Sequence, residues 1–120
     1  MNDTISDVIC ERVIYFRKQQ VIVVKISAPK QINDETYGKS DSYCRFVIEG
    51  LGSGKVRKIW GIDGFQAIHL AMMAIGAELY SSQEARAGDL TWEAGDVPGD
   101  LGFPVPPGLV DLVPPGASGL

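Results

Sequence analysis

The single histidine, His69, is the first residue to consider for chemistry, because imidazole is the commonest general base and metal ligand in proteins. Its helical neighbours, three and four positions away, are Phe65, Gln66, Met72 and Met73. None of them is a carboxylate that could orient the ring, and a metal site would need one or both of the distant cysteines, Cys10 and Cys44. The sequence therefore predicts a structural histidine, two free buried thiols, and no catalytic, metal or cofactor site.

The glycine-rich run from Gly50 to Lys55 resembles a phosphate-binding loop. Such a loop has four residues between its first glycine and Gly-Lys, continues with Ser or Thr, and opens a helix. Here three residues separate Gly50 from Gly54, Val56 follows Lys55, and the next residues have the pattern of a strand. We therefore predict a tight turn between two strands at this position.

Acidic and aromatic residues in the second half offer two further kinds of chemistry. Paired carboxylates act as acid and base only when a rigid scaffold separates their pKa values. The following four lie in a Gly- and Pro-rich region and are interpreted as a solvated rim: Asp89, Glu93, Asp96 and Asp100. The tryptophans, Trp60 and Trp92, are interpreted as buried anchors, Trp60 at a corner between sheet and helix.

Strands must form the framework for any site. Segments rich in β-branched and aromatic residues predict strands at 8–17, 21–28, 42–50 and 55–62, with a short fifth at 90–92. The polar stretch 30–41 has no period and is predicted to be a loop. In the fourth segment Val56, Trp60 and Ile62 share one register, which Lys58 interrupts, so a bulge or a strand edge is expected there.

One long helix is predicted from about residue 64 to residue 80. Asp63 is its expected N-cap, with Gln66 in the position of a capping box. One face carries large apolar residues at helical spacing: Phe65, Ile68, Met72, Ile75 and Leu79. The opposite side is also apolar, and it forms the candidate partner interface: Leu70, Met73, Ala74 and Ala77.

A helix that is apolar on two sides needs two covers. The sheet is one of them. The second is the chain's own tail around Leu101 to Val105, the same helix of a second copy, or another protein. The chain is therefore divided into a single α+β domain at 1–104 and a Pro/Gly-rich tail at 105–120, in which the density of proline disfavours regular helices and internal strands.

The charge is distributed unevenly along the chain. Residues 1–60 carry ten Lys/Arg and seven Asp/Glu, and residues 61–120 carry one and eight, which gives the net charge of −4. An acidic chain without a basic stripe argues against nucleic-acid binding. The longest apolar run, Leu70 to Ala77, is too short to cross a membrane, and the polar N-terminus lacks the pattern of a signal peptide. We expect a cytoplasmic location.

Four segments together resemble a family of small bacterial proteins known only as a domain of unknown function. They are Trp60 to Ala67, Ile75 to Leu79, Leu90 to Trp92 and Leu101 to Pro104. The resemblance covers about residues 8–104 and implies no catalytic residues. Size, acidity and a sheet-plus-helix build are also similar to immunity proteins that neutralise toxins, which is an analogy at the level of the fold.

The predicted fold is α+β: a four- to five-stranded, mainly antiparallel meander with one long helix packed across it and an extended Pro/Gly-rich C-terminal tail. The leading functional hypothesis is a non-enzymatic protein-binding module, with an immunity-like or accessory role. One alternative is a small-ligand or enzymatic domain whose pocket, between the sheet and the 30–41 loop, gathers Tyr37, Tyr43, Arg45 and His69. The other alternative is a structural homodimer.

Overall fold

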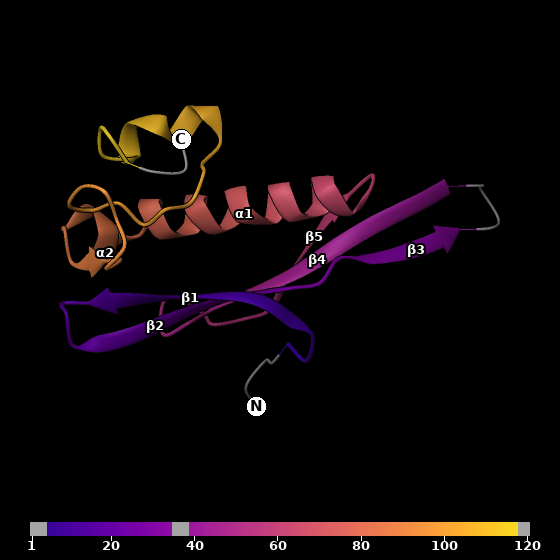
Figure 1. The fold of residues 1–120 in the computed structure, drawn as a ribbon, viewed down its shortest axis with the longest axis horizontal. Helices are drawn as coiled ribbons and strands as arrows, with labels where there is room; N and C mark the ends of the chain where they lie inside the picture. The colour runs from indigo at the N-terminus through magenta and orange to yellow at the C-terminus, as the bar shows by residue number, and fades with distance from the viewer. Residues whose placement is uncertain (1–4, 35–38, 118–120) are drawn as a thin grey trace.

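A computed structural model describes residues 5–34 and 39–117 of the chain. The fold is α+β, with an open antiparallel sheet and one long helix packed on it (Figure 1). The strands are β1 Val8–Phe16, β2 Gln20–Ser27, β3 Lys30–Asp34, β4 Lys39–Glu49, β5 Arg57–Gly61 and β6 Leu90–Thr91. The helices are α1 Gly64–Ser81, the one-turn α2 Gln83–Arg86 and a 3₁₀ helix at Pro107–Leu112. No helix within the described ranges is long and apolar enough to cross a membrane.

The sheet is a meander at its centre, because β1 pairs with β2, β2 with β4, and β4 with β5, all antiparallel. β3 continues the line of β2 after a break at Ala28-Pro29 and pairs with the first half of β4. β6 lies on the outer side of β1, opposite only Tyr15 and Phe16. β5 therefore forms one edge of the sheet. β1 forms the other edge, except at Tyr15 and Phe16, where the short β6 pairs with it.

The predicted loop at 30–41 is wrong, because Lys30–Asp34 and Lys39–Glu49 form a hairpin that projects beyond the helix (Figure 1). Pro29 interrupts the hydrogen-bond ladder of the preceding strand, since proline has no amide hydrogen. The hairpin arm extends past the core, so its polar residues need no buried face and show no alternating pattern. This hairpin is why the sheet has six strands within the described residues rather than four or five.

The core lies between the sheet and α1. The sheet contributes side chains that alternate along its strands: Ile14, Ile22, Val24, Ile26, Cys44, Phe46 and Ile48. The helix contributes Ala67, Ala71, Ile75 and Leu79. The buried face is therefore centred on small residues near the start of the helix, and Phe65, which we expected on it, is 88% exposed. Alanines at these positions let the helix backbone approach the sheet closely.

The C-terminal segment covers the outer side of the second half of α1 (Figure 1). A side chain at Gly76 would collide with the carbonyl oxygen of Pro104, so the two backbones touch there. Leu101, Phe103, Val105 and Val113 join the same apolar core as the sheet and the helix. The chain after β6 is therefore a second covering layer, and it includes a six-residue 3₁₀ helix that begins with a proline.

Candidate functional site

The turn from β5 into α1 is a rigid corner. A Cβ atom at Gly61 would lie 2.5 Å from the amide nitrogen of Ala67, so only glycine lets the first turn of the helix rest on the end of the strand. Asp63 caps the helix by accepting a hydrogen bond from the Gln66 amide, at 2.9 Å. The Gln66 side chain in turn accepts one from the Ile62 amide, at 2.7 Å. Asp63 is thus confirmed as the N-cap. Gln66 reaches back to the amide of Ile62, one residue before the cap, so the pair is a variant of the capping box, in which the amide of the N-cap itself would be the donor.

The corner holds three large apolar side chains in the open. Trp60 is 47% exposed, Ile62 73% and Phe65 88%. We call these three residues the corner patch. Because the backbone between them is held by the capping box and by the close approach at Gly61, the side chains stand on a fixed frame rather than on a free loop. Large apolar side chains exposed close together in sequence on a fixed backbone are typical of a contact surface for another molecule.

Trp60 belongs to a small cluster on the face of the sheet opposite α1. Ile59, next to it, packs against the core, so Trp60 points the other way, beside Tyr43 of the neighbouring strand. The two ring centroids lie 5.1 Å apart. The ammonium group of Lys58 lies 4.4 Å from the Tyr43 centroid and 5.5 Å from that of Trp60, within range of a cation–π interaction. The expected burial of Trp60 is therefore wrong.

The predicted ligand pocket is not gathered by this fold. Tyr43 and Arg45 alternate with the buried Cys44 along β4 and so lie on the sheet face away from α1. His69 is an exposed residue of α1, which packs on the other face. Tyr37 lies outside the described residues. Arg45 already has a partner, since its Nη2 donates to Asp7 Oδ1 at 2.7 Å.

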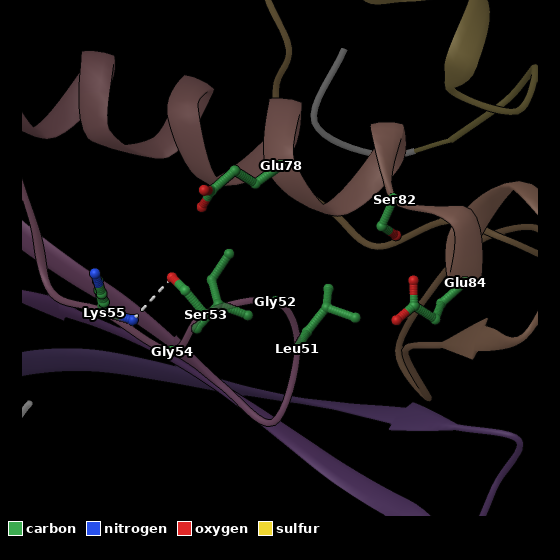
Figure 2. Close-up of a pocket in the computed structure, with 9 residues that line it drawn as sticks. Leu51, Gly52, Ser53, Gly54, Lys55, Glu78, Ser82 and Glu84 are labelled. Atoms are coloured by element: carbon green, nitrogen blue, oxygen red, sulfur yellow. Dashed lines mark hydrogen bonds between the residues drawn. The ribbon is translucent and has the colours of Figure 1, made fainter. Parts of the chain in front are cut away.

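A cavity of about 190 Å³ opens between the β4–β5 turn and the end of α1 (Figure 2). It is lined by the glycine-rich turn on one side and by Glu78, Ser82 and Glu84 on the other. Glu78 is in an ion pair with Arg57 at 2.8 Å, and the Lys55 amide donates to Ser53 Oγ at 3.3 Å. Because the turn leads into a strand rather than a helix, and two glutamates line the cavity with Lys55, this site lacks the helix N-terminus after the turn and the net positive charge that favour phosphate.

A polar cluster under the C-terminal segment holds that segment in place. Asp100 is 1% exposed and accepts hydrogen bonds from the amides of Asp96 and Gly102, both at 2.8 Å. The Tyr80 hydroxyl accepts one from the Leu101 amide at 2.8 Å. Burial raises the pKa of Tyr80, and the nearby Asp100 carboxylate raises this pKa further. Asp100 is therefore not part of a solvated rim, since its charge is spent on backbone amides.

Arg12 closes this cluster from the side of β1. Its Nη1 donates to the carbonyl oxygens of Leu101 and Gly102, at 3.1 and 2.9 Å. Its guanidinium lies 4.0 Å from the ring centroid of Trp92 and 4.5 Å from that of Phe103. Burial lowers the pKa of Arg12, while the charge of Asp100 opposes this effect. All of these groups are engaged with one another, so the cluster serves the fold.

The candidate partner interface on the helix lies beside the region that the tail covers. Leu70 is 37% exposed, while Met73, Ala74 and Ala77 are half-buried, and Ala74 packs against the core. The four residues thus present less apolar surface than the corner patch. Sequence reasoning missed Ile62 and Phe65 as surface residues. The available indication was Gly61, whose lack of a side chain sets how the helix docks on the strand.

The sequence profile of a family described as a domain of unknown function, DUF6968, matches residues 10–105. That range contains every strand except the first residues of β1, both α-helices and the corner patch. No match was found among curated proteins or among solved structures. The profile covers most of the chain, and the protein belongs to this family of unknown function.

Proposed function

We propose that the protein is a non-enzymatic protein-binding module and that the corner patch is its contact surface. The observation that carries the proposal is the exposure of Trp60, Ile62 and Phe65 within six residues of sequence on a rigid frame. Tryptophan is enriched among the residues that dominate binding energy at protein interfaces. A preformed surface also binds with a smaller loss of conformational entropy than a flexible one.

The narrower form of the proposal is an immunity-like or accessory role in a bacterial cytoplasm. It is supported by charge, because residues 61–120 carry eight acidic residues and one basic residue. A basic partner would be attracted to such a chain, and a toxin neutralised by an immunity protein is one example of such a partner. Attraction of this kind accelerates association, while the apolar corner patch would supply most of the affinity.

The test compares three proteins as affinity baits in extracts of the native host. They are the native chain, the double variant Ile62→Ser/Phe65→Ser, and the control Val21→Ser. Val21 is 52% exposed and lies at the other end of the sheet, beside the β1–β2 turn (Figure 1). We expect one partner to be recovered with the native chain and the control, and to fall at least about tenfold with the double variant, a loss of roughly 1.4 kcal/mol.

Equal recovery with all three baits would contradict the proposal. Sedimentation of the purified chain separates self-association from binding to another protein. A dimer that dissociates in the double variant would assign the corner patch to a second copy of this chain, the structural-homodimer alternative. Both substituted side chains are largely exposed, so the free energy of unfolding of the double variant is expected to lie within about 0.5 kcal/mol of that of the native chain.

A further inference from the structure

A second surface, separate from the corner patch, lies on the helix-facing side of the sheet, between α1 and the outer edge of β1. It is a groove of about 180 Å³. Val24 and Ile26 of β2 contribute to its lining from the sheet, and Ile68 and Met72 from α1. Phe103, Ile75, Ile9 and Cys10 add to this apolar lining, and the charged residues Glu11 and Arg12 also border the groove.

The groove exists because α1 and the C-terminal segment, which both pack on the sheet, leave a gap between them. α1 packs mainly over β4 and β5, so it leaves the faces of β1 and β2 to other segments. The C-terminal segment buries one end of that area, where Ile14 and Leu90 are 0% and 3% exposed. At the other end, around Cys10 and Ile9, both residues are exposed. The groove lies where these two covers meet, over sheet residues that are themselves largely buried, with Val24 at 3% and Ile26 at 8% exposure.

The edge of β1 beside the groove has no strand partner along most of its length. β6 pairs only with Tyr15 and Phe16, so the described chain places no strand against this edge from Val8 to Ile14. The Arg17 amide donates to Asp89 on the β6 side, at 2.8 Å. Because amides alternate in direction along a strand, those of Val13 and Glu11 point to the same open edge. Unpaired amides of this kind are a template for another strand.

We propose that this edge and groove bind an extended peptide segment of a partner protein by strand addition. The segment would lie along Val8–Ile14 and place one large apolar side chain in the groove. A cavity of about 150 Å³ already holds a group the size of benzene, so the volume suits one such side chain. Main-chain hydrogen bonds would supply affinity, and the groove would select the side chain.

The chain itself indicates this kind of occupant. Its own β6 adds to the same edge in the antiparallel direction, and Leu90 on β6 is buried against the core. Phe103, from the extended run that follows, fills the near end of the groove and is 7% exposed. The face is thus already covered in part by extended chain with apolar side chains. A partner segment would continue that arrangement over the part left open.

The two cysteines provide the readout. Cys10 is exposed at the rim of the groove, so its predicted burial is wrong, whereas Cys44 is buried in the core at 0% exposure. A bound segment would cover Cys10 and leave Cys44 unchanged. Alkylation of the native chain with iodoacetamide, followed by mass spectrometry of each cysteine, therefore measures occupancy of the groove.

The probe is a display library of random peptides about a dozen residues long, selected on the native chain. We expect enriched peptides to share β-branched residues around one large apolar position. At about ten times its Kd, such a peptide should slow alkylation of Cys10 about tenfold. N-methylation of alternate peptide amides on the bonding side should abolish protection, because it removes the main-chain hydrogen bonds. The corner variant Ile62→Ser/Phe65→Ser should leave the protection of Cys10 intact. A negative result in this test therefore does not count against the proposal for the corner patch, and the reverse also holds.

A matched pair of protein variants tests the edge from the other side. Val13→Pro removes the outward amide hydrogen, and Val13→Thr keeps it. Protection should be lost in the first variant and retained in the second, with circular dichroism reporting whether each has folded. If Val13→Pro does not fold, the N-methylated peptides still decide. The proposal is overturned if no selected peptide protects Cys10, if N-methylation has no effect, or if Cys10 becomes protected without peptide as protein concentration rises.

Discussion

The side chains that hold the C-terminal covering segment in place are titratable groups in partly or fully buried positions. Arg12, Tyr80 and Asp100 come from three distant parts of the chain, and each satisfies backbone groups of the 96–103 segment. An unpaired buried amide or carbonyl costs about 1–3 kcal/mol, so the loss of any one of these side chains would loosen this segment. The core also buries Cys44, a thiol with no such partner among the described hydrogen bonds.

These buried groups predict a loss of stability at alkaline pH. Burial raises the pKa of Cys44 above its ordinary value of 9.0 and that of Tyr80 above 10.0. A raised pKa in the folded state means that the unfolded chain releases its proton first, so the stabilisation is complete below the ordinary pKa and is lost as pH rises through the folded value. Urea unfolding at pH 7 to 11 should therefore show a free energy that declines from about pH 9.

The variant Tyr80→Phe separates the two contributions to this decline. It is expected to be less stable at neutral pH, because the Leu101 amide loses its acceptor. Above about pH 10 its free energy of unfolding should fall less steeply than that of the native chain, since only the unfolded native chain gains the tyrosinate. Identical slopes in the two proteins would show that Tyr80 is not responsible.

At the scale of elements, one glycine determines how closely the second layer approaches α1. The substitution Gly76→Ala places a Cβ atom against the Pro104 carbonyl and Val105, so either the helix or the covering segment must move. We expect a loss of about 1–3 kcal/mol in urea unfolding, as for other overpacked sites. Gly108→Ala is the matched control, because a Cβ atom there meets nothing within 4 Å. Similar effects of the two substitutions would show that the backbones at Gly76 are free to separate.

Most of the elements could be predicted from the sequence, because their patterns are local. The helix is marked by the Asp63 cap and a long apolar run, and β1, β2 and most of β4 by β-branched residues. The β3–β4 hairpin could not be predicted, because it stands outside the core and has no face to bury. The predicted register of β5 is wrong, because it places the larger apolar side chain, Trp60, on the inward face. In the structure Ile59 contacts the core instead.

The candidate site was harder to predict than the fold, for the same physical reason. Hydrophobicity suggests that Trp60 and Phe65 are buried, and in most sequences this inference holds. Their exposure follows from tertiary packing, because Ile59 rather than Trp60 packs against the core, and Ala67 rather than Phe65 is the buried residue at the start of the helix. The four-residue interface on the outer side of α1 was recognisable as apolar, but the extent of its cover by the tail depends on a contact between residues far apart in sequence.

At the scale of the whole molecule, two truncations test how the layers depend on each other. Ending the chain after Pro106 removes Val113, a 6% exposed residue of the core. We expect this protein to stay folded and monomeric, with a loss of about 1–3 kcal/mol for the lost burial. Ending it after Gly99 also removes Leu101, Phe103 and the carbonyl partners of Arg12. Circular dichroism and sedimentation should then show an unfolded or aggregated chain.

A cooperative, monomeric unfolding transition in the chain that ends after Gly99 would contradict this dependence. It would mean that the sheet and α1 form a complete unit and that the C-terminal segment merely rests on it. The chain that ends after Pro106 is the control, because it keeps Leu101, Phe103 and Val105 and is shortened only beyond them.

Because the two tryptophans have contrasting surroundings, the fluorescence of one can be distinguished from that of the other. Trp60 stands in solvent beside the ammonium group of Lys58, which draws iodide toward the indole, whereas Trp92 is roofed by the guanidinium of Arg12. Iodide should thus quench the fluorescence of Trp60 first. The remaining fluorescence, from Trp92, then reports unfolding. Docking at the corner and melting of the interior would then register as separate spectral events in an unlabelled sample.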